Sequence, residues 1–332
     1  MDKRQRVLSA LNHITPDKVP YSVELTSEAM KRFSEYSGIT AAEYFDLVGN
    51  HLEKCSYNDG SYIKSGYFKD EFGVLWNRSG VDKDIGVVEE YLLPEDDFSG
   101  YTFPIPDLEA VSKKTRAMME NGKDTFKLGK IGMTFFERAW SLRGMENLMC
   151  DFHCNEAFTE ELFDKILEYN LQIVNAALKF PIDGFYFGDD YGMQTGLMFS
   201  PDSFRKYLKP CLRALFEPIK SKGKKVMLHS CGNIEKILPD LIEIGLDVYQ
   251  TVQPEIYDLK KLKREFGKDL SFWGGISTQR DLPNLSAGEI SALTRETIEI
   301  LGENGGYICG PTHQVPADVP PENIAAMIEF LK

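Results

Sequence analysis

A histidine and two cysteines have the residue types and the spacing to bind a metal ion. His229 and Cys231 end the segment 224–232, and Cys309 ends the segment 305–310. Both segments are typical of β-strands that run into loops, and residues i and i+2 of a strand share a face, about 7 Å apart. One imidazole and two thiolates suit zinc. Three protein ligands and an open fourth position are typical of catalytic zinc sites.

The same residues also have a structural interpretation, which spacing alone leaves open. Free cysteine packs as a small hydrophobic residue, and a histidine can be buried without binding metal. A second group of similar type, Cys150, His153 and Cys154, lies in a segment whose apolar spacing indicates helices. We therefore interpret that group as structural.

Polar side chains follow the other predicted strands. Asp189 and Asp190 are candidates for acid–base catalysis or substrate contact, but only one of two adjacent strand residues can face a given side. A loop turn or helix N-cap is the alternative for this pair. His313 is a candidate catalytic group, with an ordinary loop histidine as the equal alternative, and Glu24 is a candidate fourth ligand or substrate contact. Three further residues are candidates for substrate binding: Tyr191, Gln253 and Gln279.

Composition narrows the class of protein. The net charge is −13 over 332 residues, and the pI is near 5.0, which argues against nucleic acid or an anionic membrane as a partner. The N-terminus lacks the apolar region of a signal peptide, and no stretch approaches the ~20 apolar residues of a membrane span. Six cysteines are too sparse for a disulfide framework. We expect a cytoplasmic protein that acts on small molecules.

Alternating strands and helices predict parallel βαβ units. About eight such units, in a chain longer than the usual ~250 residues, favour a (β/α)₈ TIM barrel over a doubly wound open sheet. We expect a single domain over 1–332, with an N-terminal helix in 1–18 and an irregular insertion at 57–101. The predicted strands are 19–25, one hidden near 72–76, 126–133, 184–189, 225–230, 248–252, 271–276 and 306–309. The predicted helices are 156–178, 201–222, 234–244, 259–266, 286–301 and 321–331.

Several motifs resemble those of the uroporphyrinogen decarboxylase superfamily. They are the opening segment 4–19, His-Ser-Cys-Gly-Asn at 229–233, Gly-Gly-Ile-Ser-Thr-Gln at 274–279, the segment 305–313 and Pro-Pro-Glu-Asn at 320–323. The resemblance extends over nearly the whole chain. It implies a (β/α)₈ barrel, in agreement with the pattern of strands and helices.

This superfamily has two chemically different branches. Decarboxylases hold a polyanionic substrate with an Arg-Gln-Ala-Gly-Arg type motif, but the equivalent stretch here, 24–32, reads Glu-Leu-Thr-Ser-Glu-Ala-Met-Lys-Arg. Losing this guanidinium clamp argues against decarboxylation. The other branch contains zinc methyltransferases that work with corrinoid proteins, and their His-x-Cys…Cys pattern corresponds to His229, Cys231 and Cys309.

The resemblance therefore implies zinc-dependent transfer of a methyl group between a corrinoid and a small-molecule thiol or methyl donor. The sequence shows no Asp-x-His-x-x-Gly segment, so we expect the corrinoid (methylcobalamin) on a partner protein. A homodimer is among the assemblies that the sequence allows. Two alternatives stay open: a cofactor-free uroporphyrinogen decarboxylase, and a non-catalytic barrel that binds a ligand.

Overall fold

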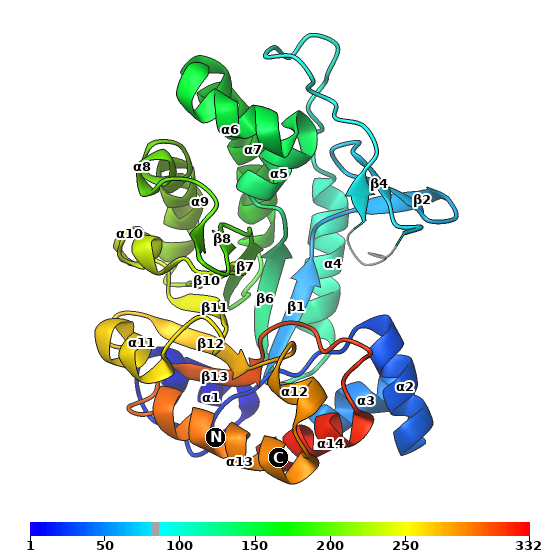
Figure 1. Cartoon of the computed structure of the whole chain (residues 1–332), viewed down its shortest axis with the longest axis vertical. Coiled ribbons are helices and arrows are strands. Elements are labelled where there is room, and N and C mark those ends of the chain that lie inside the picture. Colours follow the sequence, from blue (N-terminus) through cyan, green and yellow to red (C-terminus); the bar gives the residue numbers. More distant parts are fainter. Residues whose placement is uncertain (81–85) are drawn as a thin grey trace.

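A parallel sheet of seven strands forms the centre of the molecule. The computed structural model describes residues 1–80 and 86–332. The strands follow one another in chain order across a curled sheet, in which the arrows of β1 and β6 point upward in Figure 1. They are β1 (Leu52–Ser56), β6 (Phe126–Ile131), β7 (Gly184–Gly188), β10 (Lys225–His229), β11 (Val248–Val252), β12 (Ser271–Ile276) and β13 (Tyr307–Pro311). The α/β class and the predicted strands from β6 to β13 are confirmed, within two residues at each end.

The sheet is an open, curled one rather than a closed eight-stranded barrel. Segment 21–25, predicted as part of the first strand, makes isolated parallel bridges from Tyr21 to Cys309 and from Leu25 to Val315. Its backbone bonds to the residue just before β1, where the N–H of His51 donates to the carbonyl of Tyr21 at 3.0 Å. Segment 21–25 therefore lies along β13 in the place of an eighth strand without pairing continuously with β1.

The prediction that a strand of the barrel lies near 72–76 is wrong, because the strand found there belongs to another sheet. The strand that precedes β6 in the sheet is β1, Leu52–Ser56, whose sequence includes the charged Glu53 and Lys54. Such a strand lacks the apolar run that marks a buried parallel strand. Residues 75–77 instead form β4 (Leu75–Asn77) of a separate antiparallel sheet, with β2 (Gly60–Lys64), β3 (Tyr67–Asp70) and β5 (Val87–Val88). This sheet lies within the insertion 57–101 that we expected to be irregular, of which residues 81–85 lie outside the described part of the chain.

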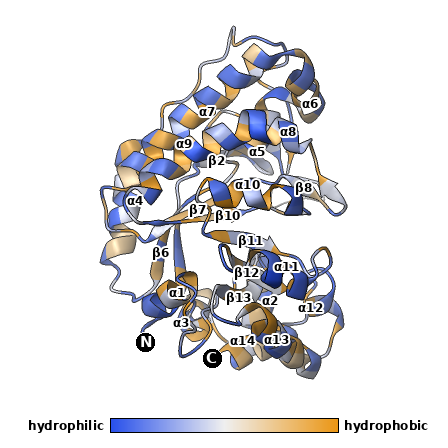
Figure 2. Ribbon diagram, turned by 90° about the vertical axis from the view of Figure 1, so that its left-hand side faces the viewer, coloured by the Kyte–Doolittle hydropathy of each residue, from blue (hydrophilic) through white to orange (hydrophobic). Residues whose placement is uncertain are grey.

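Helices cover the outer face of the parallel sheet. In Figure 2, α7 and α9 carry hydrophilic and hydrophobic residues on different sides, as expected for amphipathic helices. The N-terminal helix begins at Lys3, and Ser200 caps the helix that starts with Pro201. The helices are α1 (Lys3–Leu11), α2 (Ser27–Ser37), α3 (Ala41–Val48), α4 (Leu108–Glu120), α5 (Phe136–Arg143), α6 (Met145–Cys154), α7 (Glu156–Ala177), α8 (Pro201–Ser203), α9 (Lys209–Lys220), α10 (Leu238–Glu243), α11 (Leu259–Phe266), α12 (Asp281–Asn284), α13 (Ala287–Leu301) and α14 (Pro321–Leu331).

One hydrophobic cluster packs on each face of the parallel sheet. The larger cluster fills the space between the strands and the outer helices. The smaller one lies on the concave face and includes Val7 and Leu11 of α1, which contacts β1, β6 and β13. Its other members are Leu52, Phe126, Leu128, Tyr186, Met227, Val248, Trp273 and Ile308. The concave face is thus packed at its base, which leaves the C-terminal strand ends to form a pocket.

Among the described residues, no helix combines the length and the apolar character needed to span a membrane.

Candidate active site

A pocket of about 300 Å³ opens at the C-terminal ends of the parallel strands. Gly188 of β7, His229 of β10 and Pro311 of β13 line it where their strands end. Active sites of parallel barrels occupy this end because the loops that follow the strands converge there. The pocket therefore lies where the sequence places the candidate residues.

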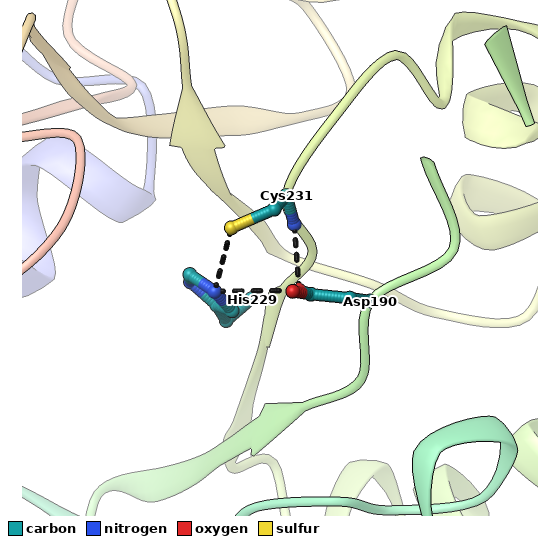
Figure 3. Close-up of side chains that lie close together, drawn as sticks. All are labelled: Asp190, His229 and Cys231. Atoms are coloured by element: carbon teal, nitrogen blue, oxygen red, sulfur yellow. Dashed lines mark hydrogen bonds and ion pairs between the residues drawn. The ribbon is translucent and has the colours of Figure 1, made fainter. Parts of the chain in front are cut away.

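Asp190, His229 and Cys231 converge in this region (Figure 3). The Nε2 atom of His229 lies 3.3 Å from Cys231 Sγ and 3.5 Å from Asp190 Oδ1. One ligand atom from each of the three residues lies within 4.8 Å of the other two. The N–H of Cys231 donates to Asp190 Oδ1 at 2.8 Å, which ties the loop after β10 to the loop after β7. Burial, with Asp190 nearby, raises the pKa of the Cys231 thiol.

Gln250 orients the imidazole of His229. Its Oε1 atom contacts His229 Nδ1 and accepts a hydrogen bond from the Tyr186 hydroxyl at 2.8 Å. The Gln250 amide also donates to the carbonyl of Thr312 at 3.2 Å. An acceptor at Nδ1 places the ring proton there and leaves the Nε2 lone pair free to bind a metal.

The loop after Cys231 requires a glycine. Gly232 has φ +78°, and a Cβ at this position would lie 2.2 Å from the carbonyl of Gly192. Its N–H donates to Oε1 of Gln253 at 2.8 Å. Gln253 is buried and does not line the pocket. It therefore supports this loop and does not make the substrate contact that we predicted.

The two adjacent aspartates have separate places, as strand geometry requires. Asp190 lines the pocket, whereas Asp189 is fully buried and points to the start of α5. Its carboxylate accepts hydrogen bonds of 2.8–2.9 Å from the N–H groups of Phe135, Phe136 and Glu137. Burial raises the pKa of Asp189, and these three N–H groups oppose that shift. Asp189 is a helix cap, so the prediction that it faces the site is wrong.

Cys309 does not join His229 and Cys231. It is fully buried in β13 and belongs to the cluster between the sheet and the outer helices, whereas its neighbour Ile308 faces the concave side. Burial raises the pKa of its thiol to about 12. Because successive strand residues alternate between faces, Cys309 points away from the pocket. The carboxylate of Asp190 stands beside the pair where we expected this thiolate.

The remaining predicted residues divide between the pocket and the core. His313 and Glu24 line the pocket. The ring of His313 faces that of His229, with centroids 5.5 Å apart, and burial together with this neighbour lowers the pKa of His313. Tyr191 is buried against Phe199 and Phe204, and Gln279 is exposed in the turn after β12; neither lines the pocket. Glu24 pairs with Lys54 rather than joining the candidate metal ligands.

Several polar residues that line the pocket were not among the predicted site residues, including Lys54, Lys130, Glu137 and Gln250. Burial, with Asp190 and Asp189 nearby, raises the pKa of Glu137 well above its ordinary value. Lys130 lies four residues after Phe126 in a predicted strand, and this even spacing places it on the same concave face as Leu128. Spacing within the strand could therefore have identified Lys130, whereas Lys54 lies in the strand that we did not predict.

The chain is similar to known proteins over most of its length. Residues 81–332 match the family model for uroporphyrinogen decarboxylase. A methyltransferase structure from Methanosarcina mazei superposes with a TM-score of 0.76 at 21% identity, covering 100% of this chain and 98% of that one, which indicates a shared fold.

Two curated relatives are methyltransferases of methanogens. A methylated-thiol–coenzyme M methyltransferase of Methanosarcina mazei is 24% identical over 135 residues, which are 41% of this chain and 34% of that protein. The methylcobamide:CoM methyltransferase MtaA of Methanosarcina barkeri is 28% identical over 131 residues, which are 40% and 36% of the two chains. The matched region spans about a third of the length of each relative.

Proposed function

The chain belongs to the uroporphyrinogen decarboxylase family, and we propose that it is a zinc-dependent methyltransferase working between a corrinoid protein and a small-molecule thiol or methyl donor. The convergence of Asp190, His229 and Cys231 at the strand ends, where Asp190 and His229 line the pocket, carries this proposal. The methyltransferase names of the two curated relatives support it.

The donor set fits zinc. His229 Nε2, Cys231 Sγ and a carboxylate oxygen of Asp190 are nitrogen, sulfur and oxygen ligands of the kinds that zinc binds, and three ligands leave a position for substrate. A bound zinc ion supplies Lewis acidity, which stabilises a substrate thiolate or the leaving oxygen of a methyl ether. Gln250 holds the imidazole in the metal-binding tautomer. Glu137, with its raised pKa, keeps a proton in the pocket for a leaving oxygen.

The pocket is less suited to porphyrinogen decarboxylation. A volume of about 300 Å³ lies at the lower end of the range for drug-sized ligands, and a tetrapyrrole is larger. Two basic residues other than histidine line it, and Lys54 already pairs with Glu24. A substrate with many carboxylates needs more cationic partners than this pocket offers.

Metal analysis of matched serine variants tests the proposal. We expect about one zinc per chain in the wild-type protein and in Cys309→Ser, and loss of zinc in Cys231→Ser, since only Cys231 lies among the three ligands. Methyl transfer from free methylcobalamin to a small thiol, followed by the absorbance of the cobalt–carbon bond, should fall with the zinc content. Full activity in a metal-free protein, or equal zinc loss in both variants, would contradict the proposal.

A further inference from the structure

Two lysines project into the side of the pocket that is formed by β1 and β6. Lys54 of β1 pairs opposite Leu128, and Lys130 of β6 pairs opposite Ser56, so the two lysines lie on neighbouring strands with a two-residue offset. Both line the pocket, together with Glu24. The chain thus places two cations and one carboxylate on this wall.

Lys54 and Glu24 form an ion pair with each other. Lys54 Nζ lies 2.5 Å from Glu24 Oε1, and both side chains are largely withdrawn from solvent, at 13% and 28% exposure. Among the interactions of the described residues, Lys130 has no ion pair within 4 Å and no side-chain hydrogen bond. Burial and the neighbouring Lys54 lower the pKa of Lys130, while Glu24 opposes this shift. A partly buried ammonium group without a direct partner is costly unless an anion binds beside it.

The other acidic residues of the pocket do not offset this charge. Asp190 belongs to the candidate metal ligands and contacts His229, and among the described residues no ion pair within 4 Å joins Asp190 or Glu137 to either lysine. One carboxylate, Glu24, therefore faces two lysines, and the lysine wall carries an excess of about one positive charge by this count.

An apolar zone separates the lysine wall from the candidate metal ligands. Tyr186 and Trp273 line the pocket with ring centroids 5.2 Å apart. Lys54 Nζ lies 5.2 Å from the centroid of each ring, and Tyr186 lies 6.4 Å from the His229 ring in an edge-on arrangement. The pocket thus presents a cationic wall, an aromatic middle and a cluster of metal ligands.

We propose that Lys130 selects a substrate that is a small organic anion, with a carboxylate or sulfonate beside Lys130 and its body against Tyr186 and Trp273. The group that gives or receives methyl then lies near Asp190, His229 and Cys231; this last placement rests on the proposed function. Glu24, Lys54 and Lys130 also border a second cavity of about 660 Å³. Neither Tyr186 nor Trp273 lines that cavity, and none of the candidate metal ligands does, so we place the anion's body in the first pocket.

Calorimetric titration of the full chain with matched pairs of probes tests this inference. The pairs are 3-methoxybenzoate with 3-methoxybenzamide, and 2-mercaptoethanesulfonate with 2-mercaptoethanol. We expect the anion of at least one pair to bind at least about tenfold more tightly than its neutral counterpart, a difference of about 1.4 kcal/mol. The responding pair then distinguishes a carboxylated ether from a sulfonated thiol. Rising salt should weaken this preference, because it screens the charge.

Variants assign the preference to one residue. Lys130→Met should abolish it, Lys130→Arg should keep it, and Lys113→Met on the exposed face of α4 should leave it unchanged. Lys54→Met should also reduce it, since Glu24 is then free to pair with Lys130. Equal binding of both members of each pair, absence of anion binding, or an unchanged preference in Lys130→Met would overturn the inference.

The test is separable from that of the proposed function. Zinc content and methyl transfer are measured independently on the same wild-type protein. Charge-selective binding that depends on Lys130 in a protein without zinc would overturn the proposed function and support this inference. Zinc-dependent methyl transfer without any preference for charge would support the proposed function and overturn this inference.

Discussion

At the scale of single residues, neighbours of identical type have different places in the structure. Asp189 and Asp190 are adjacent, yet one caps α5 from within the core and the other lies beside His229 and Cys231. Cys231 lies among the candidate ligands, whereas Cys309 packs behind the sheet. Residue type alone therefore does not identify a site residue; the face on which the side chain lies decides.

The two aspartates should respond differently to loss of charge. Asp189→Asn should lower the free energy of unfolding by about 2–3 kcal/mol, because a buried carboxylate that accepts three N–H groups loses charge-assisted hydrogen bonds. Asp190→Asn, at a half-buried position, should change the stability of the metal-free protein by less than about 1 kcal/mol and weaken zinc binding. Urea unfolding and zinc titration check both variants, and a larger stability loss in Asp190→Asn would contradict the assignment.

At the scale of elements, His51 links segment 21–25 to β1. The side chain is 2% exposed, its ring packs edge-on to Tyr21 at 4.5 Å, and its backbone N–H donates to Tyr21. Burial, with Arg6, Lys3 and Lys18 nearby, lowers the pKa of His51 to about 4. Protonation of His51 therefore destabilises the contact between segment 21–25 and the start of β1, where the curled sheet comes nearest to closing.

The free energy of unfolding should accordingly decrease as the pH falls from about 6.5 to about 4, because His51 takes up a proton on unfolding in this range. The unfolded chain binds the proton near the ordinary pKa of 6.5 and the folded chain only near 4, so the unfolded state gains in this range. The full contribution is about 3 kcal/mol, from a shift of roughly 2.5 units at 1.36 kcal/mol each. Urea unfolding at pH 7 and pH 4.5 should show a smaller loss in His51→Gln than in the wild type. Equal losses would show that His51 does not cause the effect.

At the scale of the whole molecule, Arg138 attaches the antiparallel sheet to the parallel one. Its guanidinium pairs with Asp70 at 2.6 Å and Glu71 at 3.0 Å, while Trp76 Nε1 donates to the same Asp70 at 2.9 Å. Arg138 is 1% exposed and belongs to α5, the helix that Asp189 caps. Figure 1 shows β2 and β4 beside the C-terminal end of β1. The insertion and the pocket are therefore connected through α5.

Removing this cation should destabilise the insertion more than ordinary surface changes do. Arg138→Met leaves two buried carboxylates without their partner and should cost about 3–5 kcal/mol in the free energy of unfolding. Arg213→Met, which breaks an exposed pair with Glu243, should cost less than about 1 kcal/mol. Urea unfolding compares the two, and limited proteolysis shows whether residues 57–101 become accessible. A cost for Arg138→Met as small as the control would contradict this account.

Much of the fold could be predicted because apolar strands carry their own pattern. The parallel strands β6, β7, β10, β11, β12 and β13 are short and almost fully buried runs, and parallel strands buried on both faces take this form. The β1 strand was missed because Glu53 and Lys54 line cavities and interrupt such a run. A strand with charged residues can be identified only when the residues that pair with those charges are known.

The sequence by itself determined the residue types at the strand ends, the pairing of His229 with Cys231 on one face, and the family. The tertiary structure decided that Asp190 rather than Cys309 stands beside that pair, and that Lys54, Lys130 and Glu24 share one wall. The physical reason is that spacing within one strand follows from its two-residue period, whereas the face and register of each strand depend on its neighbours. A shift of one residue moves a side chain to the opposite face, and packing of the whole sheet selects the register.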